Sequence, residues 1–526
     1  CASHCAQLAG DRRRKRMSDD QHVQRLLLQQ QHKQEQEQQA QQAQQEQHSR
    51  QQQQQQQQQL VQQQDQEQGP EDERGAQRPT RVSGSFKAPT RRSRAAAGKA
   101  TAQANSAGAS EGPIDPSVIR FKTSFRNTIY DVMLGRGWKS TDSDMDWDLH
   151  WAERDWMFEV FDSAHLEQWQ RVNHFRNDRE LCRKDLLIKN VKRHKRQLEK
   201  NKNFEEAALY DFCPKTFVLP GEYALFVETF KKAGNTTWIM KPIGKSQGRG
   251  IFLFRNLSQI SKWRSEGRWK AESSEVESYV VQRYISNPYL IGGKKFDLRI
   301  YALVTNFTPL TVYLHRGGFA RFSNSRYSSN ASDISNHYVH LTNVAVQKSA
   351  ENYNRETGGK WDVRDLKLYL MSRFGAQRID KLFKDIQDVV LRSLLSVEKV
   401  MINDKHCFEL YGYDIMFDDQ LKPWLIEVNA SPSLAANTGD DYNMKYSMLN
   451  DVLDLVDMER RLSGDETSVG GFDLIYRGGE EFRQPNSVYT TYLGCEIPRN
   501  KMRPAAKSGN GATASTAALA ARQPAI

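Results

Sequence analysis

Three oxygen-bearing side chains lie on two neighbouring apolar segments in the C-terminal half of the chain. Glu427 and Asn429 are two residues apart in Pro423–Ser433, so a strand there points both side chains the same way. Asp414 belongs to the apolar segment Tyr411–Asp418, and the short connection between the segments suits a hairpin. Pairing would place Asp414 beside the other two. Two carboxylates and an amide oxygen are hard ligands, which predicts a site for Mg²⁺, or Mn²⁺, and nucleotide phosphates.

The same alternation assigns the apolar side chains of this hairpin. Leu425 is expected on the face of Glu427, and Trp424, Ile426 and Val428 on the opposite face. The alternative is an edge hairpin whose acids are only solvated, because charged side chains are common on edge strands. The rest of the chain bears on this choice.

A glycine-rich loop forms the second candidate for chemistry. Thr236–Pro242 is expected to be a strand that carries Lys241, followed by the loop Ile243–Gly250 and a returning strand, Ile251–Phe254. The backbone N–H groups of such a flap, together with Lys241, can cover phosphates. The loop lacks the spacing of a Walker motif, and its glycines alone fit an ordinary β-turn.

A third group of charges lies on one predicted strand, Lys295–Tyr301. Lys295, Asp297 and Arg299 alternate onto one face, and the other face is apolar. Charges on a strand that otherwise looks central need partners or a ligand. Together with the flap and the metal ligands, this indicates an ATP site in which Gln282–Ile285 contacts the adenine, and Lys295 and Asp297 contact the ribose.

The elements that would position these residues occupy the middle of a 526-residue chain. Residues 1–115 are glutamine-rich and then rich in Arg, Ala, Ser and Pro, which predicts disorder; a coiled coil is the rival interpretation, but no heptad is sustained. We expect an N-terminal subdomain at 116–215, a central subdomain with the flap at 216–310, a C-terminal subdomain with the metal site at 311–462, and a mostly disordered tail at 463–526.

Composition narrows the function classes. The net charge is +11, but residues 116–495 carry 54 basic and 50 acidic residues, which argues against a broad nucleic-acid surface. No apolar run is long enough to span a membrane, and Cys1–Arg16 lacks the apolar core of a secretory signal. The six cysteines show no metal spacing and a disulfide framework is unlikely at this length, which favours a reducing, intracellular setting; we expect the cytoplasm.

One basic stretch, Arg179–Lys202, is expected to be a helix with ten Lys or Arg and three acids. Its apolar residues give a plausible buried stripe. The basic face is either solvated or an electrostatic dock for an acidic chain.

Several motifs in the same order resemble the tubulin-tyrosine-ligase-like family. The matching stretches are Trp238–Pro242, Ser246–Ile251, Gln282–Ile285, Lys295–Arg299, His340–Asn343, Gly412–Ile415 and Trp424–Ser433. The resemblance runs from about Arg120 to Asn450, and Ala302–Tyr313 and His340–Lys348 look closest to the polyglutamylase branch. The glutamine-rich head departs from the family.

The resemblance implies an α+β (mixed α/β) ATP-grasp fold and a tubulin polyglutamylase that uses ATP, Mg²⁺ and free L-glutamate. The implied ATP-binding residues are Lys241, Gln247, Gly248, Gln282, Arg283, Tyr284, Ile285, Lys295, Phe296, Asp297, Thr342 and Asn343. Arg299, Arg321 and Glu427 would be catalytic, Arg321 and Lys360 would hold the donor glutamate, and Gln247 would contact the tubulin tail. The bland alternatives are an internal ion pair for Arg321 and a solvated loop position for Lys360.

The resemblance also implies partners and a location. The acidic C-terminal tails of tubulin in microtubules would be the substrate, with an accessory subunit plausible, at the cytoskeleton of a cilium basal body or flagellar axoneme. A donor other than glutamate (glycine or tyrosine) and a catalytically weak microtubule-binding scaffold remain open. Neither a nucleic acid nor a membrane is expected as a partner.

Overall fold

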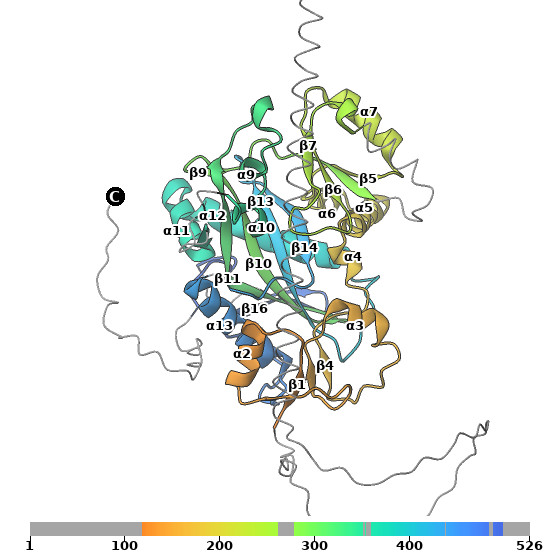
Figure 1. Cartoon of the computed structure of the whole chain (residues 1–526), viewed down its shortest axis with the longest axis vertical. Coiled ribbons are helices and arrows are strands. Elements are labelled where there is room, and N and C mark those ends of the chain that lie inside the picture. The colour runs from red at the N-terminus through yellow and green to blue at the C-terminus, as the bar shows by residue number, and fades with distance from the viewer. Residues whose placement is uncertain are drawn as a thin grey trace, which may run out of the picture. The chain divides into compact units, whose positions relative to one another are not determined.

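The computed structural model describes residues 118–260, 278–350, 353, 359–436, 438–482 and 488–497, which belong to one compact unit, residues 107–526 (Figure 1). The predicted disorder of residues 1–115 lies outside the described residues. Within the described part of the chain, no helix combines the length and the apolar character needed to cross a membrane. The described cysteines, Cys182, Cys213, Cys407 and Cys495, form no disulfide.

The N-terminal part pairs four short parallel strands with a set of helices. The strands are β1 (Arg120–Lys122), β2 (Lys139–Ser140), β3 (Leu149–His150) and β4 (Arg171–Val172), in the order β2-β1-β3-β4. The helices are α2 (Thr128–Gly135), α3 (Arg154–Glu159), α4 (Arg179–Cys182), α5 (Lys184–Lys200) and α6 (Phe204–Ala208). The single helix predicted over Arg179–Lys202 is therefore two helices, because the backbone of Arg183 is extended at φ −80° and ψ 125°.

The central part is an antiparallel sheet with an aromatic core. Its strands are β5 (Thr216–Leu219), β6 (Trp238–Pro242), β7 (Phe252–Phe254) and β8 (Tyr279–Arg283), in the order β5-β8-β6-β7, and α7 (Tyr223–Ala233) and the 3-10 helix η1 (Leu257–Ile260) accompany them. Phe226 on α7 packs edge-to-face against Trp238, with ring centroids 5.2 Å apart. The pairing of β6 with β7 confirms the predicted flap hairpin.

The remaining strands form a larger antiparallel sheet, nine-stranded in the described residues, whose long strands lie side by side (Figure 1). They are β9 (Leu290–Ile291), β10 (Lys294–Phe307), β11 (Leu310–Arg326), β12 (Lys360–Asp362), β13 (Glu409–Phe417), β14 (Pro423–Asn429), β15 (Ser468–Val469), β16 (Phe472–Arg477) and β17 (Glu480–Glu481). Because β10 pairs with β11 and β13, it belongs to this sheet and not to the central sheet, so the predicted boundary at residue 310 comes too late.

The same sheet corrects the predicted tail. Residues 463–526 were expected to be mostly disordered, yet β16 pairs with β11 and its side chains Phe472, Leu474 and Ile475 are buried. Burial of these apolar side chains explains why this segment is ordered. Residues 498–526 lie outside the described residues.

Helices cover both faces of the large sheet. On one face, α11 (Val363–Phe374) and α12 (Ala376–Leu395) pack on the even-numbered side chains of β10, which include Phe296, Leu298 and Ile300. The break between them falls at Gly375 (φ 83°), a backbone conformation that glycine adopts readily. On the other face, α13 (Gly439–Val456) and α2 pack on Tyr301 and Leu303. Three short elements precede β12: η2 (Ala331–Asp333), α9 (His337–His340) and α10 (Val344–Gln347).

Candidate active site

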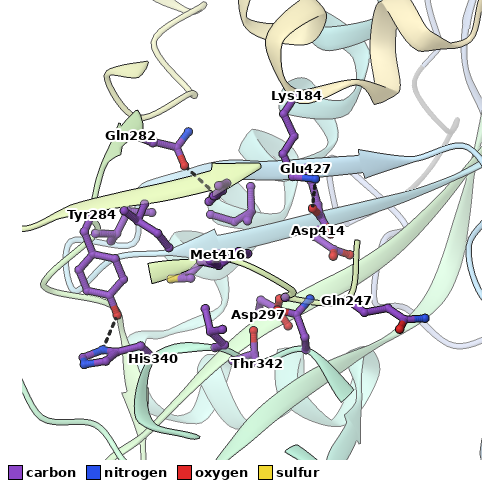
Figure 2. Close-up of a pocket in the computed structure, with 18 of the residues that line it drawn as sticks. Lys184, Gln247, Gln282, Tyr284, Asp297, His340, Thr342, Asp414, Met416 and Glu427 are labelled. Atoms are coloured by element: carbon purple, nitrogen blue, oxygen red, sulfur yellow. Dashed lines mark hydrogen bonds and ion pairs between the residues drawn. The ribbon is translucent and has the colours of Figure 1, made fainter. Parts of the chain in front are cut away.

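One cavity lies between the flap, the end of β8 and strands β10, β13 and β14 (Figure 2). It encloses a space of about 730 Å³ that is partly open to solvent. The predicted ATP-binding and metal-binding residues that line it are Lys241, Gln247, Gly248, Gln282, Arg283, Tyr284, Ile285, Lys295, Asp297, Thr342, Asn343, Asp414 and Glu427. The structure thus brings together residues from seven separate stretches of the sequence.

The predicted metal ligands lie on the β13–β14 hairpin. Asp414 is the cross-strand partner of Glu427, and Gly412 is the partner of Asn429. The Asn429 Nδ2 atom donates to the Gly412 carbonyl oxygen at 3.2 Å, which leaves the amide oxygen as the atom suited to a cation. Lys184 of α5 lies 3.5 Å from Glu427, as the upper part of Figure 2 shows. Asn429 is not part of the cavity lining, although it shares the strand end with Glu427.

A β-bulge changes which side chains of β14 face the cavity. The register shifts between the pairs Asp414–Glu427 and Ile415–Leu425, so Ile426 is an extra residue on this strand. Ile426 therefore lines the cavity beside Glu427, and Leu425 packs in the core on α12. The simple alternation predicted for Leu425 and Ile426 is wrong at this point.

Four charges form a ladder across β11, β10 and β13. Arg321 contacts Asp297 at 2.6 Å and Asp414 at 2.8 Å, and Arg299 contacts Asp414 at 2.6 Å. All four side chains are buried. Burial opposes ionisation of Asp414, but the guanidinium groups of Arg299 and Arg321 hold its pKa well below the usual range. The ladder thus keeps Asp414, a predicted metal ligand, ionised at physiological pH.

Arg299 and Arg321, predicted as catalytic, lie next to the described cavity and do not line it. Their internal ion pairs are present, but Asp414 belongs both to the ladder and to the cavity wall. The two guanidinium groups therefore reach the cavity only through the acids that they bind.

Lys360 is not a solvated loop residue, which was the alternative to a donor-binding role. It lies on β12 directly across from Arg321 on β11. Its ammonium group donates to Asp441 at 2.9 Å, and Lys445 contacts the same carboxylate at 3.2 Å. Burial lowers the pKa of Lys360, and burial lowers that of Lys445 to about 8. A cluster of cations thus continues the ladder away from the cavity.

Two buried lysines face the cavity from opposite sides. Lys241 donates to Gln282 at 2.9 Å, and Lys295 donates to the Tyr284 hydroxyl at 3.0 Å and to the His340 carbonyl oxygen at 2.7 Å. Burial lowers the pKa of Lys241 to about 8 and that of Lys295 to about 7. A polyanion in the cavity would favour the charged form of both lysines.

The flap tip has a strained backbone. Gln247 and Gly248 both have left-handed backbones, with φ of 62° and 82°. A Cβ atom at Gly248 would lie 3.0 Å from Val346 and 3.4 Å from Asn343, so a side chain there would have to push the facing loop away. This close approach brings the flap against the loop that carries Thr342 and Asn343.

The lining suits a nucleotide with its metal. Ile239, Leu341 and Met416 supply apolar walls for a base, and Lys184, Lys241 and Lys295 supply cations for phosphates. Asp414, Glu427 and the Asn429 oxygen would supply hard donors for Mg²⁺, as the sequence predicts. When bound there, the ion supplies positive charge that offsets the charge of the phosphates.

The comparison with family models gives the family. Residues 162–463 match the model of the tubulin-tyrosine ligase family, which is more than half of the chain. This chain belongs to the tubulin-tyrosine ligase family. Membership makes the chain a ligase with an ATP-grasp type of fold, as the sequence motifs predict.

Curated relatives support the polyglutamylase branch of the tubulin-tyrosine ligase family. The chain is 47% identical over 417 residues to "Probable tubulin polyglutamylase TTLL9" of Rattus norvegicus, covering 72% of this chain and 90% of that protein. It is 49% identical over 364 residues to "Probable tubulin polyglutamylase ttll-9" of Caenorhabditis elegans, covering 69% and 86%. "Probable alpha-tubulin polyglutamylase Ttll1" of Tetrahymena thermophila is 43% identical over 388 residues, covering 69% and 94%.

The predicted set of ATP-binding residues contains one wrong member and lacks several residues that line the cavity. Phe296, predicted to contact ATP, packs in the core on α11 and α12, because neighbouring residues of a strand face opposite sides. Sequence reasoning missed Lys184, Ile239 and Met416. Alternation along β6 could have indicated Ile239, which shares a face with Lys241, but nothing local indicates that Lys184 reaches Glu427.

The basic helix α5 divides its cations between structure and solvent. Lys184 lies at the cavity, and Lys192 donates to the Thr216 carbonyl oxygen at 2.8 Å. Lys189, Arg193 and Arg196 are exposed. The expected dock for an acidic chain therefore reduces to the exposed cations and remains a prediction.

Proposed function

We propose that this protein is an ATP-dependent ligase that adds glutamate to the γ-carboxylate of a glutamate in an acidic tubulin tail. The observation that carries the proposal is the direct succession of three groups of side chains at the cavity. Lysines line the cavity, Asp414 and Glu427 form its wall, and the guanidinium groups of Arg299 and Arg321 lie behind that wall. Groups suited to binding phosphates, a metal ion and carboxylates thus lie next to one another.

In this proposal the chain's residues bind and orient two carboxylate substrates. Lys241 and Lys295 hold the phosphates of ATP; we assign Lys295 to the phosphates in place of the expected ribose contact, because it lines the cavity with Lys241. Arg299, which lies behind Asp414, adds positive charge that stabilises the γ-phosphoryl group as it passes to the acceptor carboxylate. The amino group of free glutamate then attacks the acyl carbon, phosphate leaves, and an isopeptide bond forms. A fixed guanidinium group suits this task because it remains charged and offers several donors.

The donor and the tail have their own proposed contacts. Arg321 and Lys360 each offer a cation to a carboxylate of the incoming glutamate. Gln247, at the flap tip over the cavity, contacts the tubulin tail. Both guanidinium and ammonium groups are already paired with Asp297, Asp414 or Asp441, so the donor competes with internal acids for them.

The relatives' names support tubulin as the acceptor. We place the protein at the cytoskeleton, in a cilium basal body or flagellar axoneme, with an accessory subunit as a possible further partner. These assignments rest on the family resemblance and on the relatives.

The test is incubation of the full chain with ATP, Mg²⁺, microtubules and isotope-labelled glutamate, followed by mass spectrometry of the tubulin tails. We expect tails that carry added labelled glutamate joined through a side-chain carboxylate. Incorporation of glycine or tyrosine in parallel reactions, with none of glutamate, would replace the donor. Binding to microtubules without any incorporation would support the scaffold alternative.

A further inference from the structure

A buried polar cluster lies behind the metal hairpin, outside the cavity. It joins His174 and Asp178, near the end of the N-terminal part, to Glu409 at the start of β13, with Arg154 and Tyr411 around them. His174 and Asp178 are 1% exposed and Glu409 is fully buried. Burying so many polar groups is costly unless each has a partner, so the cluster calls for an explanation.

A metal ion is a poor explanation, because the three side chains are buried outside the cavity and protein donors already engage both carboxylates. Asp178 accepts two bonds from Arg154, at 2.5 and 2.7 Å. The Oε2 atom of Glu409 accepts from the Phe175 backbone at 3.1 Å and from the Tyr411 hydroxyl at 2.8 Å. Its Oε1 atom lies 2.9 Å from His174 Nδ1. The cluster is thus a closed network with His174 at its edge.

The neighbours of His174 determine where its proton lies. Asn173 Oδ1 accepts from the Ala152 N–H at 2.7 Å, so the amide nitrogen of Asn173 faces His174 Nε2 at 3.2 Å. An amide nitrogen only donates, so Nε2 of His174 is an acceptor and Nδ1 carries the proton toward Glu409. Burial lowers the pKa of His174 to about 4, in keeping with this neutral tautomer.

The remaining contact of His174 reaches the turn that follows the metal ligand. The Ser431 hydroxyl lies 3.3 Å from His174 Nε2 and, because that nitrogen accepts, it is the donor. Ser431 comes two residues after Asn429. The next residue, Pro432, packs tightly on Gly412. A Cβ atom added to Gly412 would lie 2.8 Å from the Pro432 side chain.

Gly412 connects this turn to the active site in two ways. Its carbonyl oxygen accepts from Asn429 Nδ2, which orients the amide oxygen. A Cβ atom at Gly412 would also lie 3.3 Å from Arg299, so Pro432 and Arg299 pack on either side of the same glycine. The position of the turn therefore bears on both a predicted metal ligand and a predicted catalytic guanidinium group.

We propose that His174, held in one tautomer by the buried cluster, is a positioning residue that fixes the turn at Ser431 and thereby orients Asn429 toward the metal. The inference rests on the metal role of Asn429 and Glu427 in the proposed function. It assigns a role at the active site to a part of the N-terminal region that touches no substrate.

Ser431 offers the cleaner test, because removing His174 would take away the donor to the buried Oε1 atom of Glu409 and could unfold the protein. In the full chain, we expect Ser431→Ala to weaken the affinity for Mn²⁺, measured by electron paramagnetic resonance with ADP present, by about tenfold. The value of kcat should fall by a similar factor, and KM for glutamate and the melting temperature should stay near wild type. Ser431→Thr keeps the hydroxyl and should restore Mn²⁺ affinity, and Ser433→Ala, at an exposed serine of the same turn, should change nothing.

Two results would overturn the inference in distinguishable ways. If Glu427→Gln abolishes Mn²⁺ binding and Ser431→Ala leaves it unchanged, the metal site stands and the positioning role is wrong. If Glu427→Gln itself leaves Mn²⁺ binding unchanged, the metal assignment in the proposed function fails, and the positioning role fails with it.

Discussion

The odd-numbered face of β10 changes character half-way along the strand. Lys295, Asp297 and Arg299 are charged, whereas Tyr301 and Leu303, next on the same face, are buried in an apolar core. The neighbouring strands change with it. Asp297 and Arg299 lie beside Arg321 and Asp414, and Leu303 lies between Tyr313 and Leu410.

The two halves of this strand face contribute differently to the stability of the fold. Burial of apolar side chains stabilises the fold directly, whereas buried ion pairs roughly break even or cost free energy against apolar replacements. The charged half therefore adds little stability for its size. Its value lies in holding charges at fixed positions for ligands, and the apolar half supplies the rigid support.

The largest expected effect is at Glu427, the cross-strand partner of Asp414 beside the charged half. Glu427→Gln removes one negative charge from the metal site but leaves a side chain of the same shape, so turnover should fall by about a hundredfold or more. Glu427 is partly exposed and its only described ion pair is 3.5 Å long, so the melting temperature should barely change. The measurement is the initial rate of glutamate incorporation with thermal unfolding in parallel. Glu480→Gln, at an exposed acid of β17, is the matched control. A folded variant with wild-type turnover would remove the distinction between the two halves.

The opposite pattern is expected from the apolar half. Leu303→Ala opens a cavity in a fully buried position and should reduce the free energy of unfolding by about 2–5 kcal/mol. The turnover number per folded molecule should stay near wild type. Urea unfolding and active-site-normalised rates check both, and Leu303→Met, which nearly conserves volume, should cost less than about 1.5 kcal/mol. Loss of turnover with unchanged stability would show that this half also takes part in chemistry.

A smaller effect is expected at the far end of the ladder. Lys360→Ala should raise KM for glutamate about tenfold, equivalent to ~1.4 kcal/mol, and narrow the preference over glycine. Asp441 keeps Lys445 as a partner, so no buried acid is left alone, unlike Asp297 after loss of Arg321. KM for ATP should not change, and the exposed Lys405→Ala should have no effect. An unchanged KM for glutamate would place the donor pocket elsewhere.

The smallest effect concerns pH. Lys241 and Lys295 are charged below their pKa values of about 8 and about 7, so the cavity attracts phosphates most strongly at low pH. As the pH rises from about 6.5 to about 8.5, both lysines lose their protons in the free enzyme. The value of kcat/KM for ATP at saturating glutamate should therefore fall about fivefold over this window. A value that rises with pH would contradict the assignment of these lysines to the phosphates.

Local patterns predicted much of this contrast. Alternation along Lys295–Tyr301 was enough to separate the charged face from the core face, and the short connection before Pro423 was enough to predict the hairpin. The glycine-rich loop between two expected strands was enough to predict the flap, whose strand pairing the structure confirms.

The sequence could not predict features that depend on distant partners. The bulge at Ile426 depends on how β14 pairs with β13, and it reverses the faces of Leu425 and Ile426. Lys184 reaches Glu427 because α4 ends at Cys182 and a separate helix, α5, begins at Lys184. The partner of Lys360, Asp441, lies 81 residues away at the start of α13. These three features depend on packing between residues far apart in the sequence, so the spacing of neighbouring residues does not predict them.

The central claim is that the charged half of β10 activates a carboxylate by phosphoryl transfer, and the fate of the carboxylate oxygen tests it most directly. An acceptor peptide with heavy oxygen in its glutamate side-chain carboxylates is incubated with the full chain, ATP, Mg²⁺ and glutamate. We expect one heavy oxygen to pass to inorganic phosphate for each isopeptide bond formed. Isopeptide bonds formed with unlabelled phosphate would contradict it.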